Sequence, residues 1–237
     1  MDKTKRRLRV GFGILILTVA VLLVPSRTVV ASNDMATAQG MVDRARVTFS
    51  GFMRDTNYAW LHENVDRAKG VLIFPQVLKG GFIFGGSGGT GVFVVRDPKT
   101  GQWSNPAFYT IGSVTFGLQI GGESAEVIMV AMTQKAIDSL LSSSFKLGGD
   151  TSIALGPVGA GAKASADLPS VTADFISFAK SKGLYAGLNL EGAVVAVRDS
   201  LNKAYYSKDV RPADIIVKMD FNNKGSYALR QTLKCKC

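Results

Sequence analysis

The sequence has little of the equipment that most enzymes need. Among 237 residues it contains one histidine, His62, and two cysteines, Cys235 and Cys237. Nucleophilic triads usually need a histidine base, and zinc sites need clustered histidine or cysteine. We therefore expect His62 to be a surface or packing residue. The two cysteines could bind a soft metal or cross-link chains, but we favour a frayed terminus with incidental thiols.

Carboxylate pairs are present but are not distinctive. Glu123 with Glu126, and Asp209 with Asp214, are the right residue types for a glycosidase-like pair, but such spacings are common in any sequence. We expect a protein that is not an enzyme and uses no cofactor and no metal. A hydrolase is kept only as a third hypothesis.

Charge is sparse as well and lies mainly at the two ends. Charged residues make up 19% of the chain, and the net charge is +10. Residues 1–31 carry +5 and the last twenty carry +4, whereas residues 32–217 hold 17 positive and 16 negative side chains. A DNA-binding domain is expected to carry its excess of Lys and Arg on the folded body. The distribution predicts no nucleic-acid partner.

One apolar run is long enough to suggest targeting. Val10–Val24 is uncharged, follows the basic segment Met1–Arg9, and precedes Val29-Val30-Ala31, which has small residues at positions −3 and −1 of a cleavage site. Fifteen residues are short for a membrane span, which needs about 20. We predict a signal peptide over residues 1–31, cleaved after Ala31, and a periplasmic or envelope location. The alternative is an uncleaved amino-terminal membrane anchor.

What the sequence has in abundance is glycine, 26 in all, which favours a β-rich protein. In Ala68–Asp97, three short apolar runs are separated by Pro75, by Gly80-Gly81 and by residues 85–91, which predicts a tightly bent β unit. Residues 86–91 fit the dinucleotide-binding pattern G-x-G-x-x-G. The strand-like Val92–Val95 follows where a helix would have to begin, so we predict a glycine-rich strand connection and no nucleotide.

The residues before this stretch have the periodicity of a helix. Asn33 or Asp34 can cap a helix reaching Arg54, whose apolar residues form one stripe: Ala38, Met41, Val42, Ala45, Phe49, Phe52 and Met53. We expect the stripe to pack on a sheet, the alternative being a helix that lies on an anionic lipid surface. Shorter helices are expected over Leu61–Lys69, with Gly70 as its cap, after Thr133, and near Pro212.

Together these patterns predict an α+β fold in one domain. We expect eight to ten short strands in a strongly curved, largely antiparallel, glycine-rich sheet or barrel, with the amphipathic helix outside and short covering helices. The domain should span residues 32–217, followed by a basic carboxy-terminal tail over 218–237. Residues 91–97 and 192–199 share a strand-then-Arg-Asp pattern that suggests, without establishing, a duplicated hairpin.

Three long segments carry a family resemblance: AKGVLIFPQVLKGGFIFGGSGGTGVFVVRD, WSNPAFYTIGSVTFGLQIGGESAEVIMV and GLYAGLNLEGAVVAVRD. In this order they resemble the SYLF domain, also called the Ysc84 actin-binding domain, over about residues 33–217. The resemblance implies binding of phosphoinositides and other anionic membrane lipids, and of actin in fungal and animal members. An export signal on a stand-alone domain resembles a bacterial envelope protein.

Lipid binding needs cations that neutralise phosphates, each contributing roughly 1 kcal/mol near an anionic surface. The candidate lipid-binding residues are Arg44, Arg46, Arg54, Arg67, Lys69 and Lys79. Our first hypothesis is a non-enzymatic domain that associates with anionic phospholipid or phosphoinositide membranes. The alternative is a structural or protein-interaction module of the envelope, whose glycine-rich β surface meets a protein partner.

Overall fold

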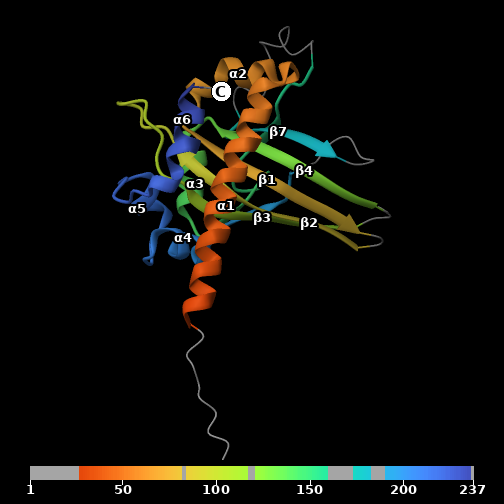
Figure 1. Ribbon diagram of the computed structural model, residues 1–237. Helices are drawn as coiled ribbons and strands as arrows, with labels where there is room; N and C mark the ends of the chain where they lie inside the picture. Colours follow the sequence, from red (N-terminus) through yellow and green to blue (C-terminus); the bar gives the residue numbers. More distant parts are fainter. Residues whose placement is uncertain (1–26, 82–83, 117–120, 160–172, 183–189, 236–237) are drawn as a thin grey trace, which may run out of the picture.

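An eight-stranded, strongly curled sheet forms the centre of the protein, with helices packed on both of its faces (Figure 1). The computed structural model describes residues 27–81, 84–116, 121–159, 173–182 and 190–235. Most of the expected signal peptide therefore lies outside the described residues. The expected cleavage site after Ala31 falls inside a described helix, α1 (Arg27–Arg54).

The sheet is antiparallel throughout, except where β6 pairs with β7. In spatial order its strands are β5 (Ser144–Lys146), β8 (Val194–Val197), β3 (Ala107–Phe116), β2 (Phe84–Val95), β1 (Gly70–Gly81), β4 (Gly121–Ala131), β7 (Phe175–Lys182) and β6 (Ile153–Leu155). The predicted α+β class and curved, largely antiparallel sheet are confirmed. The four central strands, at 10 to 12 residues, are longer than the short strands we expected.

Strand β1 is continuous through Pro75, which we had expected to interrupt it. The register of β1 shifts against both neighbours at this point, so Pro75 lies in a β-bulge, where its missing N–H is tolerated. The glycines of residues 85–91 are likewise not a connection: they belong to β2 and pair with β1 and β3. The dinucleotide-like pattern therefore lies within a strand and lacks the helix that would hold a pyrophosphate.

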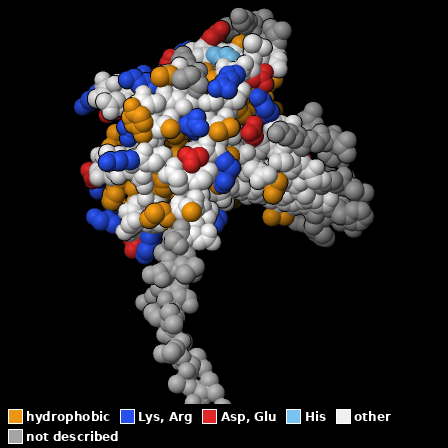
Figure 2. Space-filling view, in the orientation of Figure 1, with side chains coloured by type: hydrophobic (Ala, Val, Ile, Leu, Met, Phe, Trp, Pro, Cys, Tyr) orange, Lys and Arg blue, Asp and Glu red, His pale blue; other side chains and the backbone are white. Residues whose placement is uncertain are grey.

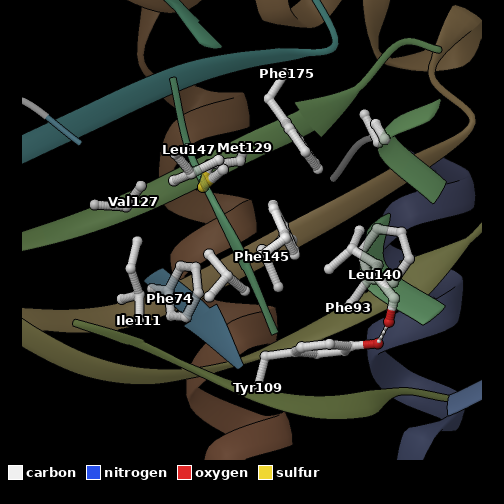
Figure 3. Packing of buried hydrophobic residues seen from close by; sticks show 14 of the residues in the cluster. Phe74, Phe93, Tyr109, Ile111, Val127, Met129, Leu140, Phe145, Leu147 and Phe175 are labelled. Carbon is white, nitrogen blue, oxygen red and sulfur yellow. Dashed lines mark hydrogen bonds between the residues drawn. The ribbon is translucent and has the colours of Figure 1, made fainter. Parts of the chain in front are cut away.

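Two apolar clusters lie on opposite faces of the sheet. The inner cluster contains alternate residues of the central strands together with α3 (Gln134–Leu141) and α5 (Pro212–Ile216). Figure 3 shows its aromatic part, in which Phe93 meets Tyr109 edge to face at 6.1 Å and the Tyr109 hydroxyl donates to the carbonyl of Leu140. The outer cluster joins the opposite strand face to α1, α2 (Ala59–Asn64), α4 (Asp199–Tyr206) and α6 (Tyr227–Cys235).

Helix α1 crosses the outer face of the sheet (Figure 1). Its predicted stripe is buried, with Met41 and Met53 at the margins, so the packing that we favoured is confirmed. The helix begins at Arg27, which makes the expected cap at Asn33 or Asp34 wrong.

Gly70 does not end a helix as expected. The segment before it forms α2 and the 3₁₀ turn η2 (Val65–Arg67), and Gly70 is the first residue of β1. A Cβ at Gly70 would come within 2.6 Å of the Phe93 ring, so packing explains this glycine.

In the carboxy-terminal part of the chain, some of the predicted elements are confirmed and others differ from the prediction. Thr133 caps α3 as predicted, and α5 begins at Pro212. Residues 199–203, expected as a turn, begin α4. The segment expected as a tail forms η5 (Lys224–Ser226) and α6, and the leucines of α6 are buried against α1.

Candidate functional site

The residues considered for catalysis do not converge in the part of the chain that the structure describes. Glu123 and Glu126 lie three apart in β4 and so face opposite sides of the sheet. Asp209 pairs with Lys203, whereas Asp214 pairs with Arg211 and Lys218.

His62 Nε2 lies 2.9 Å from the carbonyl oxygen of Phe52, which fits a packing role. Across the described ranges, no three His, Cys, Asp or Glu side chains gather as a metal site. No helix within those ranges, α1 included, combines the length and apolar character that a membrane crossing requires.

The first three candidate cations lie on α1. Arg44 and Arg54 are exposed, and with Val47, which is 58% exposed, they follow the line of the helix that faces away from the sheet. Arg46 lies on the flank of the helix and is half-buried. Because the apolar stripe is already packed on the sheet, α1 presents mainly its polar side to the surroundings.

Helix α6 extends this surface beside α1. The two helices contact each other, and Lys224 and Lys234 are exposed on the α6 side together with Tyr227, which is 62% exposed. Figure 2, in the orientation of Figure 1, shows Lys and Arg side chains spread over this side, with apolar side chains and several acidic ones between them. The α1–α6 surface, as we call it, is a broad basic face, and at its α6 side it contains a recess of about 400 Å³ lined by Lys224, Tyr227 and Arg230.

Lys180 of β7 holds the carboxy-terminal end of α1 in place. Its ammonium pairs with Asp55 at 2.9 Å and lies over the rings of Phe52 and Tyr58 at 5.1 and 5.3 Å. The hydrogen bond from Lys180 is the main reason why the pKa of Asp55 is lowered. Lys180 is thus engaged in contacts within the fold, whereas Arg44 and Arg54 are exposed.

The other three candidates are dispersed. Arg67 is exposed in η2 and donates to Asn64, and Lys69 lines a recess of about 210 Å³ with Arg96 and Val217. Lys79 lies near the far end of β1, ten residues from Lys69, which is roughly 30 Å in a strand. The structure therefore places Arg44 and Arg54 on the outward side of α1 and Arg46 on its flank, and it leaves Lys69 and Lys79 apart.

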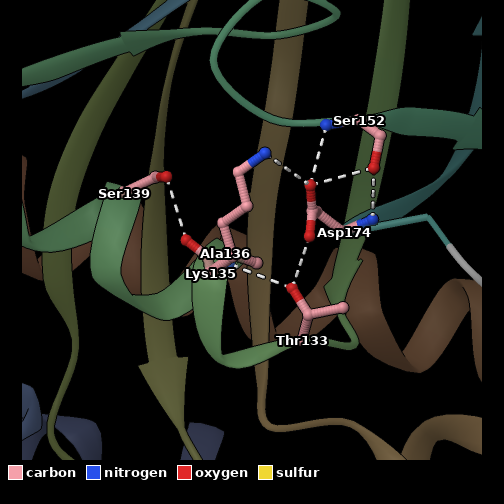
Figure 4. A network of polar contacts seen from close by, with 6 residues as sticks. All are labelled: Thr133, Lys135, Ala136, Ser139, Ser152 and Asp174. Carbon is pink, nitrogen blue, oxygen red and sulfur yellow. Dashed lines mark hydrogen bonds and ion pairs between the residues drawn. The ribbon is translucent and has the colours of Figure 1, made fainter.

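A buried acidic centre that sequence reasoning missed lies at Asp174, just before β7 (Figure 4). Its carboxylate accepts hydrogen bonds from the Thr133 hydroxyl at 2.6 Å and from the backbone and hydroxyl of Ser152 at 2.9 Å each, with Lys135 at 3.6 Å. Burial raises the pKa of Asp174, but these hydrogen bonds outweigh it and lower the pKa overall. Because both carboxylate oxygens of Asp174 already accept hydrogen bonds, we assign this centre a role in holding the fold together.

Asn105 is a second buried polar residue, and no local sequence pattern singles it out. Its side chain donates to the carbonyl of Phe221 at 2.9 Å and accepts from the backbone of Asn223 and the hydroxyl of Ser226. These bonds fasten the segment before α6 to the loop before β3. Only the spatial neighbourhood reveals this role, since the partners lie more than 100 residues away.

Comparison of the sequence with known proteins finds a family model and several relatives. Residues 112–235 match the model of the Ysc84 family, described as Las17-binding protein actin regulator. The human SH3 domain-containing YSC84-like protein 1 is 33% identical over 153 residues, which cover 64% of this chain and 44% of the relative. LAS seventeen-binding protein 3 of Saccharomyces cerevisiae is 38% identical over 143 residues, covering 59% of this chain and 30% of the relative. The matched part thus spans less than half the length of these relatives.

Proposed function

Because the chain belongs to the Ysc84 family, whose description names Las17-binding actin regulators, we propose that it is a non-enzymatic binding module that associates peripherally with anionic phospholipid membranes. The observation that carries the proposal is the basic α1–α6 surface, on which exposed cations surround exposed apolar side chains. The resemblance to lipid-binding SYLF domains supports the same assignment.

The α1–α6 surface is suited to electrostatic attachment. Three cations on α1 and two on the α6 side are worth roughly 1 kcal/mol each beside anionic lipid, or up to about 5 kcal/mol together. Val47 and Tyr227 can enter the interface between them. Since the apolar stripe of α1 is buried, attachment does not require the helix to leave the sheet.

We further propose that residues 1–31 export the protein, so that the membrane it meets is that of the envelope. The basic segment, the apolar run of fifteen residues and the small residues before Ser32 support this location.

A protein partner is the second candidate function. The names of LAS seventeen-binding protein 3 and of the family refer to a protein that they bind. The recess beside Lys69 supports this alternative, because Arg96 offers charge there and Val217, which is 56% exposed, offers an apolar contact.

The test is cosedimentation of residues 32–237, which keep both apolar clusters, with lipid vesicles. We expect binding to vesicles that contain phosphatidylserine and little binding to phosphatidylcholine alone. Raising the salt from about 0.1 M to about 1 M, which shortens the Debye length from about 10 Å to about 3 Å, should release the protein. The triple variant Arg44→Gln, Arg46→Gln, Arg54→Gln should bind about 100-fold more weakly, because it loses roughly 3 kcal/mol of attraction.

The matched control removes three exposed lysines that lie outside α1 and α6: Lys99, Lys146 and Lys218. This variant has the same net charge as the α1 variant and should retain most of the vesicle binding. Equal losses in the two variants would show only a dependence on net charge. Equal binding to both kinds of vesicle, or binding to neither, would refute the membrane proposal and favour the protein partner.

A further inference from the structure

A row of polar side chains crosses the inner face of the sheet beyond the apolar cluster. Strand register places Lys79 of β1 opposite Glu123 of β4 on one side and opposite Ser87 of β2 on the other. Ser87 in turn lies opposite Ser113 of β3, and the two hydroxyl oxygens are 2.8 Å apart. Four adjacent strands thus each contribute one polar residue at the same level.

The two neighbouring rows of residues on the same face of the sheet differ in character. On the side of the core, the same strands carry Ala125, Val77, Gly89 and Ile111, three of which belong to the inner cluster. On the far side, three of the four positions are glycines, at residues 121, 81 and 85. Because glycine has no side chain, these three positions place no side chain next to Lys79, Glu123 or Ser87 on that side of the row.

Glu123 is the unusual member of the row. It is 5% exposed, yet neither of its carboxylate oxygens has a hydrogen-bond partner. No ion pair between described residues joins it to Lys79, although directly opposite residues have Cβ atoms only about 5 Å apart. A buried carboxylate without donors is costly, so a group that supplies donors is bound favourably there.

The opposite charges of Glu123 and Lys79 determine which kind of ligand can bind to this row. A lone cation drawn to Glu123 would be repelled by Lys79, and a lone anion drawn to Lys79 would be repelled by Glu123. A single carboxylate is also too few ligands for a metal ion. The complementary ligand carries both charges in a small space.

We propose that the row of Glu123, Lys79, Ser87 and Ser113 binds a small zwitterionic group. Its ammonium donates hydrogen bonds to the Glu123 carboxylate, and its anionic oxygens accept them from the Lys79 ammonium. The serine pair offers a further hydroxyl to the same oxygens. This site lies on the inner face of the sheet and is separate from the α1–α6 surface, so either assignment can fail without the other.

The test is calorimetric titration of the full chain with glycerophosphoethanolamine, which joins an ammonium to a phosphodiester. Ethanolamine and glycerol 3-phosphate, which each supply one of the two groups, are the comparison probes. We expect the zwitterion to bind at least tenfold more tightly than either. Glu123→Gln and Lys79→Met should each weaken it at least tenfold.

Two control variants should leave binding unchanged. Ser124→Ala alters the neighbouring position on the opposite face of β4, and Lys99→Met removes an exposed lysine in a turn. Urea unfolding establishes that each variant is folded, and Ser87→Ala, with an expected severalfold loss, replaces Glu123→Gln if that variant does not fold.

A second arm separates two sources of the ligand. Competition by phosphatidylethanolamine vesicles would assign the zwitterion to a lipid headgroup, and its absence would assign it to a free small molecule. The proposal is overturned if no probe binds, or if Glu123→Gln and Lys79→Met change stability but leave the titration unaltered. The second result would mean that the two side chains affect only the stability of the fold and do not bind this ligand.

Discussion

Asp174 is a single residue on which three elements converge, because Thr133 begins α3, Ser152 precedes β6 and Asp174 itself precedes β7. Asp174→Asn replaces one acceptor oxygen by a donor that faces another donor. We expect a loss of about 1–3 kcal/mol in the free energy of unfolding at pH 7, measured by urea denaturation. Asp138→Asn, at an exposed position of α3, should change it by less than about 0.5 kcal/mol.

The same variant has a defined pH dependence. The pKa of Asp174 is lower in the folded protein than its ordinary value of 3.8, so its contribution is complete above that value. It is lost as the pH falls through the lower, folded pKa. The difference between wild type and Asp174→Asn should therefore shrink below pH 3.8, and a constant difference down to pH 2 would contradict this origin.

Helices and strands could be predicted best where the pattern that specifies them lies within a short stretch of sequence. The buried stripe of α1, the Thr133 cap and the Pro212 start all follow from residues within a few positions of one another. The faces of β1 could not be predicted, because the bulge at Pro75 reverses the alternation of its side chains. Phe74 and Val77 consequently share the inner face, although an unbroken strand would put them on opposite sides.

The glycines of β2 fall into two kinds, which gives an element-scale prediction. A Cβ on Gly91 would collide with the backbone carbonyl of Ile73 and the ring of Phe74 at the bulge, whereas one on Gly88 would meet nothing closer than 3.9 Å. Gly91→Ala should cost about 2–4 kcal/mol, and Gly88→Ala less than about 0.5 kcal/mol, in thermal or urea unfolding. Similar effects of the two substitutions would contradict the packing that we describe.

At the scale of the whole molecule, the fold class could be predicted from the sequence, but the grouping of polar side chains on the sheet could not. Composition and glycine pattern predicted the curved antiparallel sheet, but the polar row around Glu123 arises from four strands whose register no local pattern specifies. The basic candidates Arg44, Arg46 and Arg54 could be assigned to one helix because the helical period of the apolar residues around them is regular. Lys69 and Lys79 could not be placed relative to each other until β1 was known to be continuous.

Residues 218–235, which belong to the segment expected as a tail, complete the domain instead. Leu229 and Leu233 of α6 are buried at 0% and 1% exposure against α1, and Asn105 holds the segment before them. Replacing both leucines by alanine should cost about 4–8 kcal/mol, because each buried Leu→Ala change costs about 2–5 kcal/mol. Since domains are stable by only about 5–15 kcal/mol, the variant should be largely or wholly unfolded in circular dichroism and urea titration.

The matched change alters the charges of the same segment and leaves its apolar side intact. Lys224→Gln with Lys234→Gln removes two exposed cations and should leave the unfolding midpoint nearly unchanged. The same double variant should weaken binding to phosphatidylserine vesicles by about tenfold or more, since it removes roughly 2 kcal/mol of attraction. The segment made of η5 and α6 would then serve two separable purposes, its leucines closing the core over α1 and its lysines extending the basic surface. A stable protein after loss of both leucines would show that α6 is only an appendage.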